Sequence, residues 1–143
     1  MALEGQPSDC GQLNCVGSKF FARRGVYAAG IVAECAKNSW NVAVAVVDTH
    51  SYLVYFERMD QTQTASVDIA VGKAKAAATY RRPTRAFTDA INKGSPATAT
   101  LPGVFASPGG MPIMVDGKVI GGVGVSGVTG DQDEQCAKAG LGG

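Results

Sequence analysis

The sequence predicts an α+β domain whose antiparallel sheet is built from two separate hairpins. The first hairpin is expected at 41–58, where two strand-like runs flank a short connector at 49–51. The second is expected at 111–125, where Asp116-Gly117 gives the strongest hairpin turn signal in the chain. Helical patterns precede, separate and follow these hairpins, and this order of elements does not fit an all-parallel sheet.

Length and composition fit one domain with its own core. The chain has 143 residues, of which 45% are hydrophobic and 17% charged. Thirteen basic and twelve acidic side chains give a net charge of +1, which argues against a nucleic acid or an anionic membrane as partner. No apolar run approaches the roughly 20 residues that span a bilayer. Residues 1–17 are expected to form a loose lead-in, and residues 18–143 a single domain.

The four cysteines form no Cys-x-x-Cys pair, and no histidine lies near them to complete a zinc site. They are therefore expected to be free thiols, and no metal site is expected. Free thiols and the absence of a leader pattern favour a cytoplasmic location. These cysteines are Cys10, Cys15, Cys35 and Cys136.

The first half of the domain begins with a helix and continues into the first hairpin. Apolar side chains recur at helical spacing over residues 18–38 and predict an amphipathic helix. In residues 41–48 valines alternate with smaller side chains, which predicts a central strand with a helix packed closely on its small-residue face. The aromatic-rich residues 52–58 predict its partner strand.

Alanine-rich residues 66–82 predict a helix with a narrow stripe of small side chains, beside which Lys73 lies. The stripe could pack on the sheet of its own chain or against a second copy across a two-fold axis. Thr84 is expected to cap a short helix that ends near Lys93. The apolar, proline-containing residues 95–107 are a candidate cover for a pocket.

The final helix has Thr129 or Asp131 as its expected N-cap, with Asp133 and Glu134 in the first turn. Acidic side chains at that end of a helix stabilise it through the helix dipole, which is a complete structural reason for the two residues.

Glycines are unusually dense in residues 109–127, where two strands are expected. Because glycine is costly in a strand, close approach of another chain element or of a ligand is expected there. A nucleotide loop is excluded by the order of residues, since no Gly-Lys-Ser/Thr follows. Ser126 lacks the Gly-x-Ser-x-Gly setting of a hydrolase nucleophile.

Nine short motifs occur in a characteristic order along the chain. They are Val46-Val47-Asp48, Leu53-Val54, Arg58-Met59-Asp60, Lys73-Ala74, Pro83-Thr84, 109–113, Asp116-Gly117, 121–127 and Gln132-Asp133-Glu134. Taken together, these motifs resemble the GlcG/HbpS-like family over about residues 18–140. The resemblance implies a profilin-like α+β fold with an antiparallel sheet of about five strands, and assembly into dimers or larger even-numbered oligomers. Members of the family include a haem-binding extracellular protein and a domain attached to a corrinoid adenosyltransferase.

Binding of a small ligand, haem or a related tetrapyrrole, is the leading function that this resemblance implies. Haem iron needs an axial ligand, and His50 is the one histidine in the sequence. The other interpretation is that His50 is a solvent-exposed turn residue, since loops are polar and exposed. Family members often have a glycine-rich turn where this chain has 49–51. Covalent haem attachment is excluded because no Cys-x-x-Cys-His is present.

The alternative is an enzyme of the isomerase, lyase or hydrolase type that acts on a small anionic or carbonyl compound. Arg58 would bind a carboxylate, and Lys73 and Asp60 would transfer protons. The backbone around Gly109-Gly110 and Ser126 would hold an anion. A purely structural interpretation of Arg58, Asp60 and Lys73 is that they form an ion pair or a subunit contact. A third class is an accessory protein that works through its oligomer.

Overall fold

The computed structural model describes residues 15–142 and confirms the expected order of helices and strands. The hairpins form one antiparallel sheet of four strands in the order β2-β1-β4-β3, rather than the sheet of about five strands that was predicted. In the described chain the proline-containing segment after α3 forms a 3₁₀ helix and loops, and it adds no strand to the sheet. The elements are α1 (Cys15–Lys37), β1 (Ala43–Asp48), β2 (Leu53–Arg58), α2 (Ser66–Tyr80), α3 (Arg85–Asn92), η1 (Pro96–Thr100), β3 (Gly110–Val115), β4 (Lys118–Ser126) and α4 (Gly130–Gly140).

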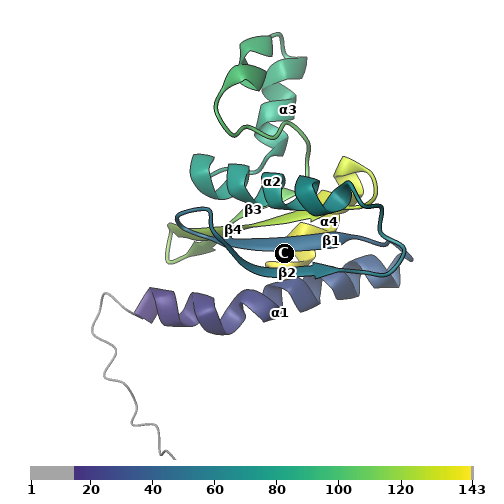
Figure 1. Ribbon diagram of the computed structural model, residues 1–143. Helices are drawn as coiled ribbons and strands as arrows, with labels where there is room; N and C mark the ends of the chain where they lie inside the picture. Colours follow the sequence, from purple (N-terminus) through teal and green to yellow (C-terminus); the bar gives the residue numbers. More distant parts are fainter. Residues whose placement is uncertain (1–14, 143) are drawn as a thin grey trace, which may run out of the picture.

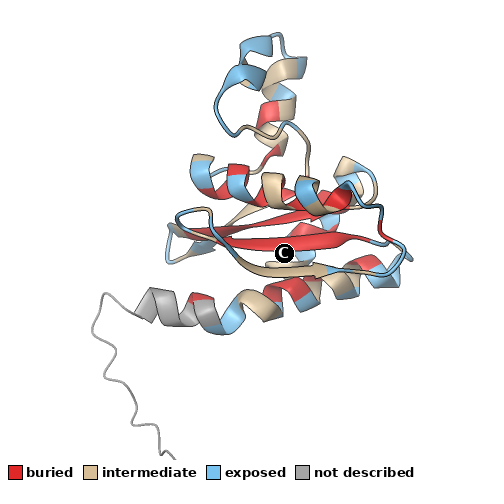
Figure 2. Ribbon diagram, viewed as in Figure 1, coloured by how far each residue is buried: buried red, intermediate tan, exposed pale blue. Residues whose placement is uncertain are grey.

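Helices cover both faces of the sheet. Figure 1 shows α1 along one face and α2 along the other, while α3 and η1 project beyond α2. The larger core lies between the sheet, α1 and α4, and Figure 2 shows that the central strands are buried. No helix among residues 15–142 is both long and apolar enough to cross a membrane. The predicted lead-in falls mostly outside the described residues, since α1 begins at Cys15.

A disulfide joins α1 to α4 and corrects the prediction of four free thiols. Cys35 and Cys136 are fully buried, and their Cα atoms lie 5.7 Å apart. They are 101 residues apart in the sequence, so spacing gave no sign of the pairing. Cys10 lies outside the described residues, and so does the side chain of Cys15. Cys35 and Cys136 therefore do not supply the free thiols on which the expectation of a reducing compartment was based.

Helix α2 packs on the sheet of its own chain, as the small-residue face of β1 predicts. The alanine stripe and the inward face of β1 are all buried. Close contact also depends on β4, where a methyl group added at Gly124 would overlap the backbone of Ala70 and Ala74. The glycine density of β4 thus serves the approach of a helix. The packed residues are Ala43, Ala45, Val47, Ala70, Ala74 and Ala78.

Gly124→Ala is expected to destabilise the fold by about 3 kcal/mol, because α2 must move away from the sheet. Gly25→Ala is the matched control, since its added methyl would lie 3.8 Å from the ring of Tyr55, an ordinary contact. That change should stabilise α1 by about 0.5–1 kcal/mol. Urea unfolding followed by circular dichroism measures both. Similar small effects at the two positions would contradict the close packing of α2.

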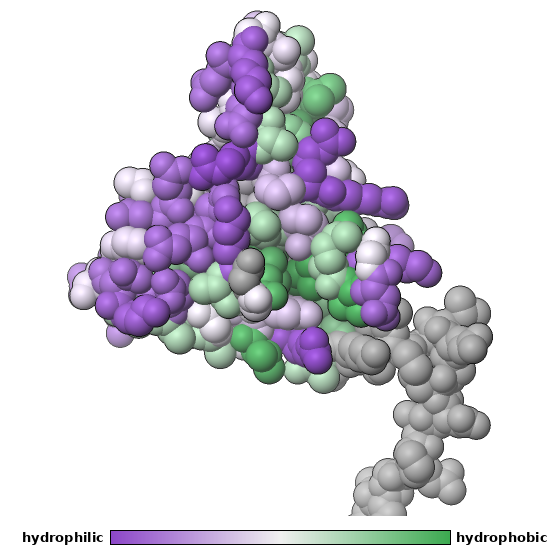
Figure 3. Space-filling view, turned by 180° about the vertical axis from the view of Figure 1, so that it is seen from behind, coloured by the Kyte–Doolittle hydropathy of each residue, from purple (hydrophilic) through white to green (hydrophobic). Residues whose placement is uncertain are grey.

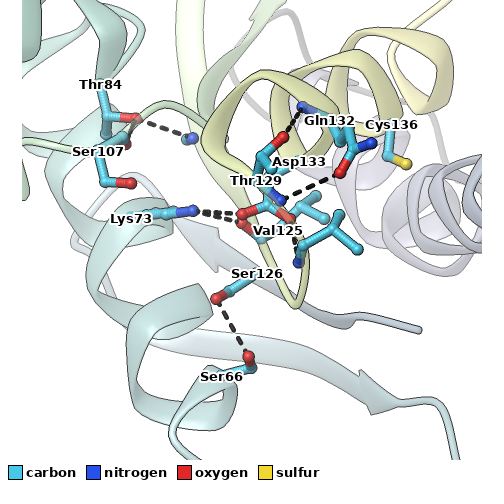
Figure 4. Close-up of polar contacts among 12 residues, drawn as sticks. Ser66, Lys73, Thr84, Ser107, Val125, Ser126, Thr129, Gln132, Asp133 and Cys136 are labelled. Carbon is cyan, nitrogen blue, oxygen red and sulfur yellow. Dashed lines mark hydrogen bonds and ion pairs between the residues drawn. The ribbon is translucent and has the colours of Figure 1, made fainter. Parts of the chain in front are cut away.

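The turn and the last helix follow the predicted chemistry. Asp116 and Gly117 have φ angles of 51° and 75°, the positive values of a type I′ hairpin turn. Thr129, rather than Asp131, caps α4, because its hydroxyl accepts a hydrogen bond from Gln132 N while the Gln132 side chain accepts one from Thr129 N. Both bonds are visible in Figure 4.

Thr84 precedes α3 but makes no side-chain cap, contrary to the prediction. Its hydroxyl instead donates to Ser107 O at 2.6 Å and accepts from Gly110 N at 2.9 Å (Figure 4). The contact ties the start of α3 to the start of β3. Residues 95–107 fold back toward α2, where the ring of Phe105 lies against Gly72.

Candidate functional site

A buried ion pair joins the three elements α2, β4 and α4. The Lys73 side chain is 2% exposed, and its Nζ donates to Asp133 Oδ2 at 2.8 Å and to Val125 O at 2.9 Å (Figure 4). Burial raises the pKa of Asp133, and hydrogen bonds from the Lys73 ammonium and from the Val128 amide oppose that rise. The ion pair therefore leaves neither partner as an isolated buried charge.

The predicted glycines lie against Lys73, Gly109 at its ammonium group and Gly110 at its backbone. A methyl group added at Gly109 would lie 2.9 Å from Lys73 Nζ, and one added at Gly110 would lie 2.5 Å from Lys73 O. Ser126 is also buried, and its hydroxyl donates to Ser66 Oγ at 3.3 Å. Four of the six predicted ligand-binding residues, Lys73, Gly109, Gly110 and Ser126, thus lie in one region. Side chains and backbone of the same chain fill this region.

The other two predicted residues lie at the surface. Arg58 and Asp60 are exposed, and neither forms an ion pair within the described part of the chain. Arg58 pairs with Ala43, which pairs on its other side with Ser126, so Arg58 is two strands away from Ser126 in the sheet. The structural ion pair considered for Arg58, Asp60 and Lys73 is not formed, because Lys73 pairs with Asp133.

Sequence reasoning did not find the role of Asp133, because the helix dipole already explained an acidic residue in the first turn. The helical periodicity of α4 could have indicated that Asp133 is buried. Asp133 lies three and four residues before Cys136 and Ala137, which are buried, so it shares the inward face of α4.

His50 lies exposed in the turn between β1 and β2. Its ring Nδ1 lies 3.3 Å from Thr49 Oγ1, and its backbone N–H donates to the Asp48 carboxylate at 2.8 Å. Asp48 also accepts from the Tyr52 N–H, so this carboxylate organises the turn. The turn is thereby fixed without any contribution from the imidazole ring of His50.

The described residues form a hollow of about 320 Å³ between α1, β3 and α4, here called the α1–β3–α4 hollow. Figure 3 shows hydrophobic side chains gathered near the centre of this face, with hydrophilic ones around them. Two cations, Arg23 and Lys138, line the hollow together with mostly apolar side chains. These are Tyr27, Met111, Pro112, Ile113, Met114 and Leu141.

A second hollow, of about 490 Å³, lies beside the β3–β4 turn and again contains two cations, Arg81 and Lys118. Met114 is 54% exposed and lines both hollows. No carboxylate side chain lines either one, although Lys138 forms an ion pair with the Glu134 carboxylate, which lies outside the lining. The edge of the sheet at β3 therefore combines apolar surface with positive charge.

These two hollows were not predicted from the sequence, because their lining comes from distant segments. None of the predicted site residues and none of residues 95–107 lines either hollow. For α1 alone, the sequence could have predicted that Arg23 and Tyr27 are neighbours, because they are four residues apart and share one helix face. Among residues 15–142, no group of three or more His, Cys, Asp or Glu side chains is arranged to hold a metal ion.

Comparisons of the sequence and of the structure with known proteins point to the same family. The family described as haem degrading protein HbpS-like matches residues 26–142. Protein GlcG of Escherichia coli K12 is 42% identical over 93 residues, which are 65% of this chain and 69% of GlcG. The family match spans most of the chain, including the whole sheet, and begins three residues after Arg23.

Solved structures share the fold. The PduOC:haem complex superposes with a TM-score of 0.77 and 25% identity, covering 85% of this chain and 91% of PduOC. A double mutant of Streptomyces reticuli HbpS superposes with a TM-score of 0.78 and 31% identity, covering 85% of this chain and 83% of HbpS. The chain therefore belongs to the HbpS-like family and is a homologue of GlcG.

Proposed function

We propose that this protein binds haem or a related tetrapyrrole in the α1–β3–α4 hollow. The observation that carries the proposal is the chemistry of the hollow, whose lining is mostly apolar and whose charged side chains are both cations. Haem has an apolar ring and two anionic propionates, so its two parts match these two features. The relative PduOC has been solved in complex with haem, which supports the choice of ligand.

Each group of residues has a separate task in this proposal. The apolar side chains of β3 and Leu141 would bury part of the ring, and Arg23 and Lys138 would bind the carboxylates through charge-assisted hydrogen bonds. Ligand pockets commonly measure about 300–1,000 Å³, so a hollow of about 320 Å³ is expected to hold only part of the ring. Bound haem would supply an iron centre for redox chemistry or ligand binding.

Arg23→Glu is expected to weaken haemin binding about tenfold, because it replaces an attraction for a propionate by a repulsion. Lys93→Glu is the matched control, since Lys93 is exposed and lines neither hollow. Titration with haemin, followed by absorbance in the Soret region, measures both variants and a His50→Ala variant. Binding that survives His50→Ala and weakens only with Arg23→Glu is the expected result.

The absence of a saturable Soret shift in the unmodified protein would rule out the haem proposal. Equal weakening by Arg23→Glu and Lys93→Glu would instead mean that net charge, rather than the α1–β3–α4 hollow, controls binding. Loss of binding in His50→Ala alone would place the ligand at the β1–β2 turn.

The remaining expectations stay predictions. They are an even-numbered oligomer, a cytoplasmic location, the profilin-like form of the fold, and an enzyme that uses Lys73 and Asp60 on a ligand bound by Arg58 and the glycine backbone. The enzyme has less support than haem binding for two reasons. The Lys73 ammonium is hydrogen-bonded to Asp133, and Lys73 lines neither hollow.

A further inference from the structure

We infer that the phenol oxygen of Tyr27 is the protein ligand of the haem iron. The inference rests on the proposed function, since it requires haem in the α1–β3–α4 hollow. Tyrosine is an established type of haem iron ligand. The evidence is the placement of Tyr27, the state of its hydroxyl and the charge around it.

Tyr27 is held firmly at the place where α1 and α4 meet. Its side chain lines the hollow although the residue is only 9% exposed. A methyl group added at Gly140 would lie 2.7 Å from Tyr27 O, and one added at Gly30 would lie 3.0 Å from the Gly140 Cα atom. The two helices are therefore in backbone contact here, which fixes the turn of α1 that carries the phenol ring.

The hydroxyl of Tyr27 has no hydrogen-bond partner among the described residues. It is also not one of the buried side-chain oxygens without a partner, which belong to Thr62 and Thr88 in the described chain, so the Tyr27 oxygen reaches the solvent. By contrast, Tyr55 donates to Glu57 and Tyr80 donates to Pro102 O. Tyr27 is the one tyrosine in the lining of the hollow, and its oxygen is available to bind a ligand.

The charge around Tyr27 suits an oxygen ligand of ferric iron. Arg23 lies one helical turn before Tyr27 on the same face, and Lys138 reaches the same hollow from α4. When the phenol binds ferric iron, an iron–oxygen bond forms, the proton goes to solvent and the oxidation state of iron is unchanged. The negative phenolate oxygen would then share the hollow with the Arg23 guanidinium and with the Lys138 ammonium, which also pairs with Glu134.

Other donors are less well placed. His50 is exposed in the β1–β2 turn and lines neither hollow, and Cys35 and Cys136 are joined to each other. Met111 and Met114 do line the hollow, so their sulfur atoms are the competing ligands. A thioether carries no charge that the two cations could balance, which favours Tyr27.

The test compares ferric haemin with metal-free protoporphyrin IX, which has the same ring and propionates but no iron. Tyr27→Phe is expected to weaken haemin binding at least about tenfold and to change the visible spectrum of the ferric complex, while protoporphyrin binding stays within about twofold. Tyr52→Phe is the matched control, because Tyr52 is 73% exposed and lines neither hollow. It should change neither affinity.

Three outcomes would overturn the inference while leaving haem binding intact. They are equal weakening of both porphyrins by Tyr27→Phe, an unchanged ferric spectrum in that variant, and a ferric spectrum that changes with Met111→Leu or Met114→Leu instead. If the unmodified protein binds neither porphyrin, the proposed function fails and the inference fails with it. Circular dichroism of each variant checks that the fold is retained.

Discussion

Lys73→Met is expected to lower the free energy of unfolding by about 3–5 kcal/mol, because it leaves the Asp133 carboxylate buried without its ammonium partner. Both side chains are 2% exposed, so water cannot replace the lost contact without a rearrangement. Replacing both partners by apolar residues removes the buried charge altogether. Lys73→Met/Asp133→Leu should therefore recover much of the loss, although the Val128 N–H then lacks its acceptor. Urea unfolding of the three proteins measures these differences.

The effect should also depend on pH. Because burial raises the pKa of Asp133 in the folded state, its protonation favours folding at low pH, and this contribution is lost as pH rises through the folded pKa. Removal of the Lys73 ammonium raises that pKa further. The deficit of Lys73→Met relative to the unmodified protein should consequently be smaller at acidic than at neutral pH.

An exposed ion pair supplies the control for this prediction. Lys37 lies 2.9 Å from Glu34 in α1, and its side chain is 71% exposed. Lys37→Met should cost at most about 0.5 kcal/mol. A loss below about 1 kcal/mol in Lys73→Met, or a double variant less stable than either single one, would mean that the buried pair does not act as a unit.

The sequence predicted those parts of the fold that local patterns decide. The Asp116-Gly117 turn, the Thr129 cap and the alternation in β1 each follow from a few neighbouring residues, and each is confirmed. Thr84 shows the limit of such reasoning. Its hydroxyl could cap α3, but it bonds to Ser107 and Gly110, because these distant residues come within 2.9 Å in the folded chain.

The candidate site was less predictable than the fold. Lys73 and the glycines at 109 and 110 were expected to share a region, and they do, but the partner of Lys73 is Asp133, 60 residues away. The α1–β3–α4 hollow depends on three elements that meet only in the folded state. Arg23 and Lys138 are ordinary surface cations in the sequence, and only their shared hollow sets them apart.

Removal of the disulfide is expected to lower the free energy of unfolding by about 3–5 kcal/mol, because a link across some 100 residues restricts the unfolded chain strongly. Cys35→Ala/Cys136→Ala makes the change, and thermal unfolding without reductant measures it. The comparison is best made in a Cys10→Ser/Cys15→Ser background, where only one intramolecular pairing can form. Treatment of that background with a thiol reductant is the second measurement. It should lower its stability toward that of the double alanine variant, and leave the variant itself unchanged.

The same link bears on the α1–β3–α4 hollow, because α1 and α4 supply its cations as well as the two cysteines. Arg23 and Tyr27 lie on α1 before Cys35, and Lys138 and Leu141 follow Cys136 on α4. Backbone contact between Gly30 and Gly140 also holds the two helices together, next to Tyr27. Reduction should therefore destabilise the whole fold more than it changes haemin affinity in molecules that remain folded. A reductant that leaves the unfolding midpoint of the background protein unchanged would show that Cys35 and Cys136 are not joined in solution.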